Sequence, residues 1–237
     1  MRKIKNINKT KIRVRTSQPE DPYTEMMFRF AIAAEYKDDD IGQHIIRVSD
    51  YSVAIARGLK CRKKEVEYIK FASIMHDIGK IGIPDKILHK KRLNSNDYDK
   101  IKEHTLIGSR IFAGSDFLLL NIAGEVALYH HEWYNGKGYP RGLKGDKIPL
   151  YARIVALADS FDVIVSHRSY KKSKSLDKAI KIIKKQKGTQ FDPKVVDAFF
   201  KALPVIKKIL NANKTINAFI KENKDLLRKE KKGSVHG

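Results

Sequence analysis

Residues that could bind metal ions recur along the chain inside or beside segments with helical spacing of apolar residues. Five of the eight histidines lie there: His44, His76, His104, His130 and His131. Each imidazole offers a nitrogen ligand, so several of them turned inward can build a metal centre. For any one of them alone, a hydrogen-bonded core histidine is the ordinary alternative.

Two of these histidines share a helix face with apolar residues. His44 is followed on its face by Val48 and Ile55, and His104 by Ile107 and Ile111. Positions three, four and seven residues apart lie on one side of a helix, so both imidazoles are expected to point inward.

Carboxylates accompany the histidines at two places. His76 and Asp77 are neighbours on a helix and diverge by roughly 100°, so they can serve adjacent points, and a carboxylate can bridge two cations. Asp159 lies among apolar residues, where an unpaired carboxylate would be costly or would protonate. A salt bridge between Asp159 and Arg153 or Arg168 is the alternative to metal binding.

The combined set contains imidazoles and carboxylates but no thiolate. This mixture favours iron, manganese or zinc over calcium or magnesium. One catalytic ion uses about three or four protein ligands, so seven candidates indicate two ions that share a carboxylate. Two ions about 3.5–4 Å apart are a recurring device for hydrolysing phosphate esters, because they hold and activate a hydroxide.

The elements that must position these residues are predicted to be helical throughout. Apolar spacing predicts helices over 23–36, 41–60, 64–76, 95–113, 117–131, 148–165, 175–187, 193–203 and 205–227. Segments 79–84 and 135–142 are rich in Gly and contain Pro, which indicates loops. We therefore expect an all-α, single-domain helical bundle. Its parts are a basic tail (1–22), the catalytic domain (23–203) and a basic C-terminal helix and tail (204–237).

Composition narrows the function classes. The chain has 49 Lys and Arg against 27 Asp and Glu, a net charge of +22, and much of the excess lies in the two tails. Such charge suits a polyanionic small molecule. The tails are expected to be solvated without a dedicated partner, and the alternatives are a nucleic acid or an acidic membrane surface, although no nucleic-acid recognition motif accompanies them. A single cysteine, Cys61, excludes an internal disulfide. The longest apolar stretch, 117–129, is too short to cross a bilayer, so we expect a cytoplasmic protein without a transmembrane segment.

Three motifs carry a resemblance to a known family. HDIGK at 76–80, HHE at 130–132 and NGKGYP at 135–140 resemble the HD-GYP subgroup of the HD phosphohydrolase superfamily. ARIVALAD at 152–159 and GTQFDP at 188–193 extend the resemblance, which covers about residues 23–203 in the family's order and spacing.

The resemblance implies an HD-type all-α fold and a phosphodiesterase that opens cyclic di-GMP to pGpG and often continues to GMP. It implies two or three divalent ions, commonly iron or manganese. The implied ligands are His44, His76, the bridging Asp77, His104, His130, His131 and Asp159. A hydroxide between two ions would attack phosphorus, with the ions and Lys80 offsetting the charge.

The same resemblance places basic residues against the substrate phosphates and a loop beside the site. Lys80, Arg168 and Lys171 match the phosphate-facing residues, and the GYP loop is Gly138, Tyr139 and Pro140. The expected partners are cyclic di-GMP or a related dinucleotide, together with signalling proteins. Since only about 20 residues precede the resembling region, we expect a catalytic domain without its own sensor domain.

Some positions depart from the family pattern. A Glu that can hold a third ion is often found where this chain has Asp40, and Val163, Ile164 and Val165 replace the usual residues after Asp162. These changes could alter substrate fit or rate.

Other functions stay open at this point. They are an HD hydrolase of other nucleotides, a cyclic di-GMP receptor or adaptor without catalysis, and a nucleic-acid-binding module. For single residues, Lys80 could be a solvated loop lysine, Arg168 a helix-end cation, and Tyr139 either a guanine-stacking or a loop-packing ring.

Overall fold

The computed structural model describes residues 22–35, 43–90, 92–166 and 175–212. Its elements are α1 (Pro22–Glu35), α2 (Gln43–Gly58), α3 (Lys63–Ile74), the 3-10 helix η1 (Ile78–Gly82), α4 (Asp85–Leu88), α5 (Ser95–Phe112), α6 (Leu118–Tyr129), η2 (Gly145–Lys147), α7 (Leu150–Val165), α8 (Leu176–Lys185) and a helix over residues 193–212. Within these ranges, β pairing is limited to two isolated bridges. The prediction of an all-α fold is confirmed.

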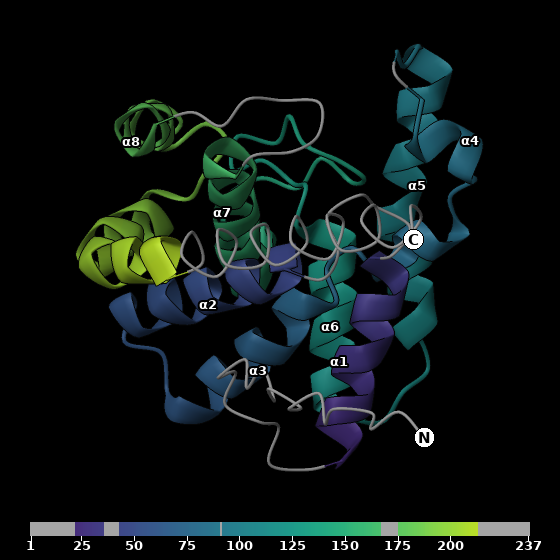
Figure 1. Ribbon diagram of the computed structural model, residues 1–237, viewed down its shortest axis with the longest axis horizontal. Helices are drawn as coiled ribbons and strands as arrows, with labels where there is room; N and C mark the ends of the chain where they lie inside the picture. Colours follow the sequence, from purple (N-terminus) through teal and green to yellow (C-terminus); the bar gives the residue numbers. More distant parts are fainter. Residues whose placement is uncertain (1–21, 36–42, 91, 167–174, 213–237) are drawn as a thin grey trace, which may run out of the picture.

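The helices form one layered bundle around a shared core. Figure 1 shows α4 and the upper part of α5 on the right, α8 and the yellow helix 193–212 on the left, and α2, α3, α6 and α7 between them. The centre is marked by Phe161 of α7, whose ring meets Tyr51 of α2 at 5.0 Å and Phe199 of helix 193–212 at 5.2 Å. All three side chains are fully buried.

Local sequence explains where several helices begin. Asn94 precedes α5, and its side chain accepts from the Asp97 N–H at 2.9 Å while the Asp97 carboxylate accepts from the Asn94 N–H at 2.9 Å. This reciprocal capping satisfies two backbone donors that a helix start leaves free. Ser175 caps α8 through a single hydrogen bond, which its side chain accepts from the N–H of Lys178.

One predicted boundary is wrong. The sequence predicts separate helices over 193–203 and 205–227, but the described chain is helical without a break from 193 to 212, through Pro204. Ala202, Ile206 and Leu210, spaced four residues apart, are buried and continue the apolar stripe across the proline. Proline has no N–H, so the carbonyl four residues earlier loses its helical hydrogen bond. Pro204 lies on the exposed side of the helix, where water can bond to that carbonyl instead. Residues from 213 onward lie outside the described residues.

Close backbone packing joins η1 to α5. A Cβ built at Gly79 would lie 1.9 Å from the carbonyl oxygen of His104 and 2.4 Å from the backbone nitrogen of Gly108. These contacts are possible only because position 79 has no side chain. The turn that follows Asp77 is thereby pressed against the helix that carries His104.

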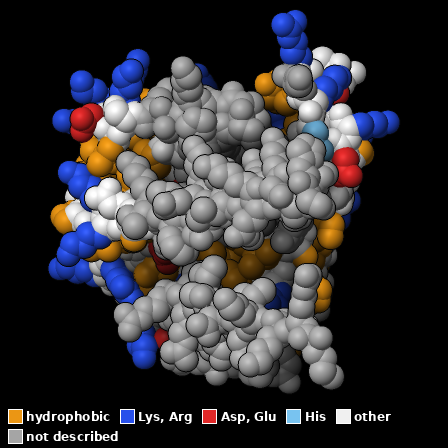
Figure 2. All heavy atoms as spheres, in the orientation of Figure 1, with side chains coloured by type: hydrophobic (Ala, Val, Ile, Leu, Met, Phe, Trp, Pro, Cys, Tyr) orange, Lys and Arg blue, Asp and Glu red, His pale blue; other side chains and the backbone are white. Residues whose placement is uncertain are grey.

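Positive charge is exposed on both sides of the bundle in Figure 2, over α4 and α5 and along the opposite edge. Figure 2 shows Lys and Arg side chains along the left edge, where α8 and helix 193–212 lie. Exposed lysines there include Lys178, Lys181 and Lys184 of α8. None of the described helices is both long and apolar enough to cross a membrane.

Candidate metal centre

Asp77 is the residue around which the predicted ligands gather. It lies between α3 and η1 and is 8% exposed, and its neighbour His76 is fully buried. Its Oδ1 atom is 3.3 Å from His104 Nε2 and 3.6 Å from His130 Nε2. Its Oδ2 atom is 3.4 Å from His76 Nε2 and 2.8 Å from Lys80 Nζ. The two carboxylate oxygens therefore face different imidazoles.

Two groups of ligand atoms share this carboxylate. In each group the possible ligand atoms lie within 4.8 Å of one another. We call them the four-ligand cluster, which is Asp77, His104, His130 and His131, and the three-ligand cluster, which is His44, His76 and Asp77. Asp159 borders the three-ligand cluster, with Oδ1 at 3.3 Å from His44 Nε2 and 4.0 Å from His76 Nε2.

Backbone carbonyls orient three of the imidazoles. The Nδ1 atoms of His76, His104 and His130 lie 2.7, 2.6 and 3.0 Å from the carbonyl oxygen three residues earlier. A carbonyl can only accept, so Nδ1 carries the hydrogen and donates. The Nε2 lone pair of each ring is then free to face Asp77, which is the arrangement that cation ligands need.

Two buried nitrogen atoms of the three-ligand cluster make no hydrogen bond. Nε2 of His44 and Nε2 of His76 are fully buried and make no hydrogen bond. Leaving such atoms unsatisfied is costly in a protein interior. A cation held jointly with Asp77 would satisfy both atoms, so the residues present fit a metal ion.

A buried ion pair supports His44 from behind. Its Nδ1 atom donates to Asp162 Oδ2 at 2.8 Å. Arg47 donates to the same carboxylate from Nε at 2.7 Å and from Nη2 at 2.9 Å. Asp162 is fully buried and Arg47 is 4% exposed. A carboxylate behind a histidine fixes its tautomer and strengthens it as a metal ligand.

Electrostatics separate the two clusters. Burial lowers the pKa of His104 to about 4, against the opposing charge of Asp77, and burial also holds the pKa of His131 well below its ordinary value. Both rings are therefore neutral at neutral pH, the form that binds cations. Burial disfavours a charged His44, yet the adjacent carboxylates of Asp159 and Asp162, the second of which accepts the Nδ1 hydrogen, raise its pKa to about 10. That ring attracts positive charge, carried by a proton or by a cation.

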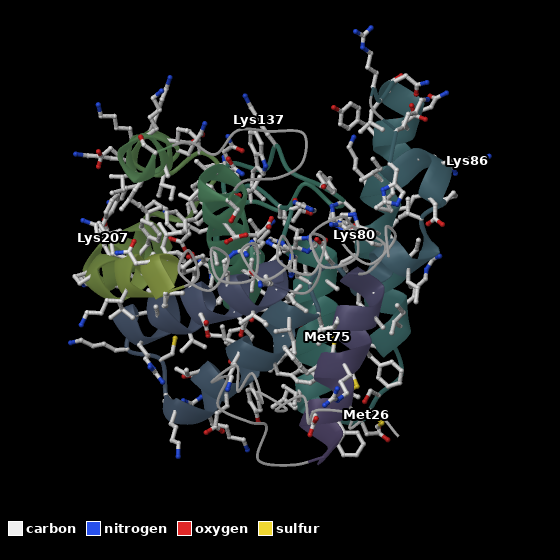
Figure 3. All side chains as sticks on the ribbon, viewed as in Figure 1. Met26, Met75, Lys80, Lys86, Lys137 and Lys207 are labelled. Atoms are coloured by element: carbon white, nitrogen blue, oxygen red, sulfur yellow. The ribbon has the colours of Figure 1, made fainter. Side chains whose placement is uncertain are left out.

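The charge on Asp77 itself is also secured. Burial alone would raise the pKa of the carboxyl group, but Lys80 and His76 hold that pKa well below its usual range. Figure 3 shows Lys80 between the core, marked by Met75, and the Gly-rich loop, marked by Lys137. Lys80 is therefore next to the candidate ligands, and its side chain stays 15% exposed.

The GYP loop packs on the four-ligand cluster. The ring of Tyr139 stacks on the imidazole of His131, with centroids 4.7 Å apart and an interplanar angle of 29°. A Cβ built at Gly138 would lie 2.2 Å from the Trp133 backbone nitrogen and 2.5 Å from the His131 carbonyl oxygen. The peptide bond between Tyr139 and Pro140 is cis. Of the two readings for Tyr139, loop packing matches this arrangement.

The structure brings together most of the predicted site residues. His44 and His104 are each 2% exposed, so their predicted inward orientation is confirmed, and His76 and His130 are buried as well. The alternative pairing of Asp159 with Arg153 is not seen, because Arg153 binds Asp146 and Asp192 instead. The predicted site residues Asp40, Arg168 and Lys171 lie outside the described residues.

Sequence reasoning missed the supporting residues. Arg47 and Asp162 are 115 positions apart, and nothing in their local pattern links them. Glu132 directly follows the histidine pair and is only 3% exposed. Its place in the HHE motif beside two candidate ligands was a signal, but the motif alone indicates no role for the carboxylate.

The chain is similar to known proteins over most of its length. Residues 30–195 match the family model described as HD domain. A cyclic di-GMP phosphodiesterase of Thermotoga maritima is 43% identical over 183 residues, covering 77% of this chain and 50% of that protein. The cyclic di-GMP phosphodiesterase response regulator RpfG of Xanthomonas campestris pv. campestris is 37% identical over 203 residues, covering 85% of this chain and 54% of that protein.

Solved structures extend the likeness at the level of the fold. A cyclic GMP-AMP specific phosphodiesterase of V. cholerae superposes with a TM-score of 0.57 at 21% identity, covering 79% of this chain and 53% of that chain. The chain spans about half the length of the two curated relatives described above.

Proposed function

The chain belongs to the HD-domain family, in its HD-GYP group, and from that premise we propose that it is a metal-dependent phosphodiesterase of cyclic di-GMP. The proposed product is linear pGpG, with further hydrolysis to GMP. The similarity to two cyclic di-GMP phosphodiesterases supports this substrate.

The observation that carries the proposal is the pair of clusters joined at Asp77. Four residues face one point and three face another, all drawn from helices or turns that the core holds in place. A site for one structural ion would not need two groups with a common carboxylate.

We propose that each cluster holds one divalent cation, iron or manganese. The four-ligand cluster would bind one ion, and the three-ligand cluster with Asp159 would bind the other. When bound, such ions supply Lewis acidity and an activated hydroxide at neutral pH. The resemblance also allows a third ion at Asp40, but the proposal requires only the two ions at the clusters.

The residues around the clusters then act on the substrate directly. Lys80 sits beside Asp77 with its ammonium partly exposed, so it can offset negative charge on a phosphate at the site. Arg168 and Lys171 are proposed to bind the phosphates, Arg168 by a bidentate contact and Lys171 as a point charge. The GYP loop closes one side of the site.

A catalytically inactive receptor is the competing function. Degenerate receptors of this kind are expected to lack metal ligands, whereas all seven ligands implied by the resemblance are present in this chain. This observation favours catalysis.

Metal analysis and a cleavage assay test the proposal together. Protein purified without oxygen should contain about two ions per chain by elemental analysis. It should convert cyclic di-GMP to pGpG, and chromatography of the reaction mixture should detect this product. His104→Ala should lose one ion and turnover, whereas His89→Ala, an exposed histidine outside both clusters, should keep both. Binding of cyclic di-GMP by metal-loaded protein without cleavage would instead establish the receptor function.

A further inference from the structure

We infer that Glu132 is a positioning residue that sets the orientation of His131 and so supports cation binding in the four-ligand cluster. The inference rests on the proposed function for the identity of the cations. The proposed role of Glu132 concerns the four-ligand cluster only, so the three-ligand cluster serves as an internal control in its test.

The first observation is how Glu132 is bonded. Its Oε1 atom accepts the backbone N–H of Arg141 at 2.7 Å, and its Oε2 atom accepts that of Leu143 at 3.0 Å. The side chain is 3% exposed. Hydrogen bonds that a carboxylate accepts are stronger than neutral ones. Glu132 therefore joins the segment just before the Gly-rich loop (residues 135–142) to Arg141 and Leu143 at the end of that loop.

The second observation is what the closed loop carries. Tyr139 lies within this loop, between Glu132 and its partners Arg141 and Leu143 in the sequence. Its N–H donates to the His131 carbonyl oxygen at 3.2 Å, and its ring stacks on the His131 imidazole. Gly138 rests directly on the backbone of Trp133. The position of the Tyr139 ring is therefore fixed by the path of the loop that Glu132 closes.

The third observation distinguishes His131 from the other histidines. The rings of His76, His104 and His130 each have Nδ1 bonded to a carbonyl, as described above. No hydrogen bond to the His131 ring occurs among the residues that the structure describes. Its ring contacts are Tyr139 at 4.7 Å, His130 at 4.0 Å and His104 at 5.1 Å.

These three observations form one chain of support. Stacking by Tyr139 takes the place of the missing hydrogen bond at His131, and Glu132 holds the loop that presents Tyr139. His44 and His76 receive their support from Asp162 and from a backbone carbonyl, with no link to this loop. Loss of Glu132 should therefore weaken one cation site and spare the other.

Glu132→Gln is the direct test, because it keeps the shape and replaces one acceptor oxygen by an amide NH2 that faces a backbone N–H. Metal-free protein is titrated with Mn²⁺ by calorimetry, and bound metal is counted after dialysis. Wild type should show two binding steps. In the variant one step should weaken by about 10–100-fold, as for loss of a residue that orients a metal ligand, and the other should stay unchanged.

Matched variants separate positioning from general destabilisation. Tyr139→Leu removes the stacked ring and should weaken the same step, while Tyr139→Phe keeps the ring and should keep the Mn²⁺ affinity. Asp97→Asn also removes a carboxylate that accepts a backbone N–H, but at the start of α5, and should lower only the melting temperature. If Glu132→Gln does not fold, Tyr139→Leu alone gives the measurement.

The results separate this inference from the proposed function. Two unchanged Mn²⁺ steps in Glu132→Gln and Tyr139→Leu, or equal weakening of both steps, overturn the positioning role. Wild type that binds two Mn²⁺ ions without cleaving cyclic di-GMP overturns the proposed activity and leaves the positioning role standing. Wild type that binds no second ion overturns both.

Discussion

The ion pair behind His44 allows a sharp prediction for Asp162→Asn. The carboxylate of Asp162 accepts from three donors, one on His44 and two on Arg47. An asparagine of the same shape presents an NH2 group to at least one of those donors. If that group turns toward His44, it donates to Nδ1 and moves the ring hydrogen to Nε2, the atom that faces the three-ligand cluster.

The magnitude follows from these contacts. Loss of a residue that orients a metal ligand costs about 10–100-fold in affinity, which is about 1.4–2.7 kcal/mol. Arg47 is also left buried without its counter-charge, and breaking a buried ion pair costs at least about 3 kcal/mol of stability. For a domain of this size that loss corresponds to a fall of about 6–12 °C in melting temperature.

A matched control separates affinity from stability. Asp192→Asn breaks another buried pair, between Asp192 and Arg153, that touches neither cluster. Both variants should melt earlier, but only Asp162→Asn should weaken one Mn²⁺ step in a calorimetric titration. Wild-type affinity in Asp162→Asn, or the same loss in Asp192→Asn, would refute the reasoning.

Three further predictions concern the shared carboxylate, the close backbone contact and the core. Asp77→Ala should lose at least one ion and all turnover, because no other carboxylate among the described residues belongs to both clusters; full metal content with normal cleavage would contradict this. Gly79→Ala, which forces a methyl group against backbone atoms of α5, should lower the free energy of unfolding in urea by about 3 kcal/mol. Gly82→Ala, whose added methyl group would meet the side chain of Ile107 rather than backbone atoms, should cost less, and equal losses would speak against the packing argument. Phe199→Ala should cost about 3–5 kcal/mol by opening a cavity, with metal content unchanged in elemental analysis.

Much of the bundle could be predicted because helical spacing of apolar residues reports burial directly. His44 and His104 were assigned to inward faces from that spacing, and both are 2% exposed. The helix through Pro204 could not be predicted this way. Local rules place a break at proline, but the apolar stripe that continues to Leu210 packs against the core and outweighs the lost hydrogen bond.

The residues that support the candidate ligands could not be predicted from the sequence, for a different reason. Asp162 meets His44 across 118 positions and Arg47 across 115, and such pairings depend on how α2 and α7 cross. Glu132 bonds backbone groups 9 and 11 residues later, so its partners depend on the path of the loop. Single-sequence patterns contain residue types and spacing, but not these paths.

The contact at Gly79 also constrains how this chain can evolve. A histidine ligand can be exchanged for another metal-binding residue with the backbone undisturbed, so ligands can drift once selection for catalysis is lifted. Position 79 has no such freedom, since even a methyl group would collide with the main chain of α5. Descendants that lost the metal ions but kept the fold should therefore retain this glycine while their histidines diverge. Retention of the glycine would then record selection on folding, and retention of the histidines would record selection on chemistry.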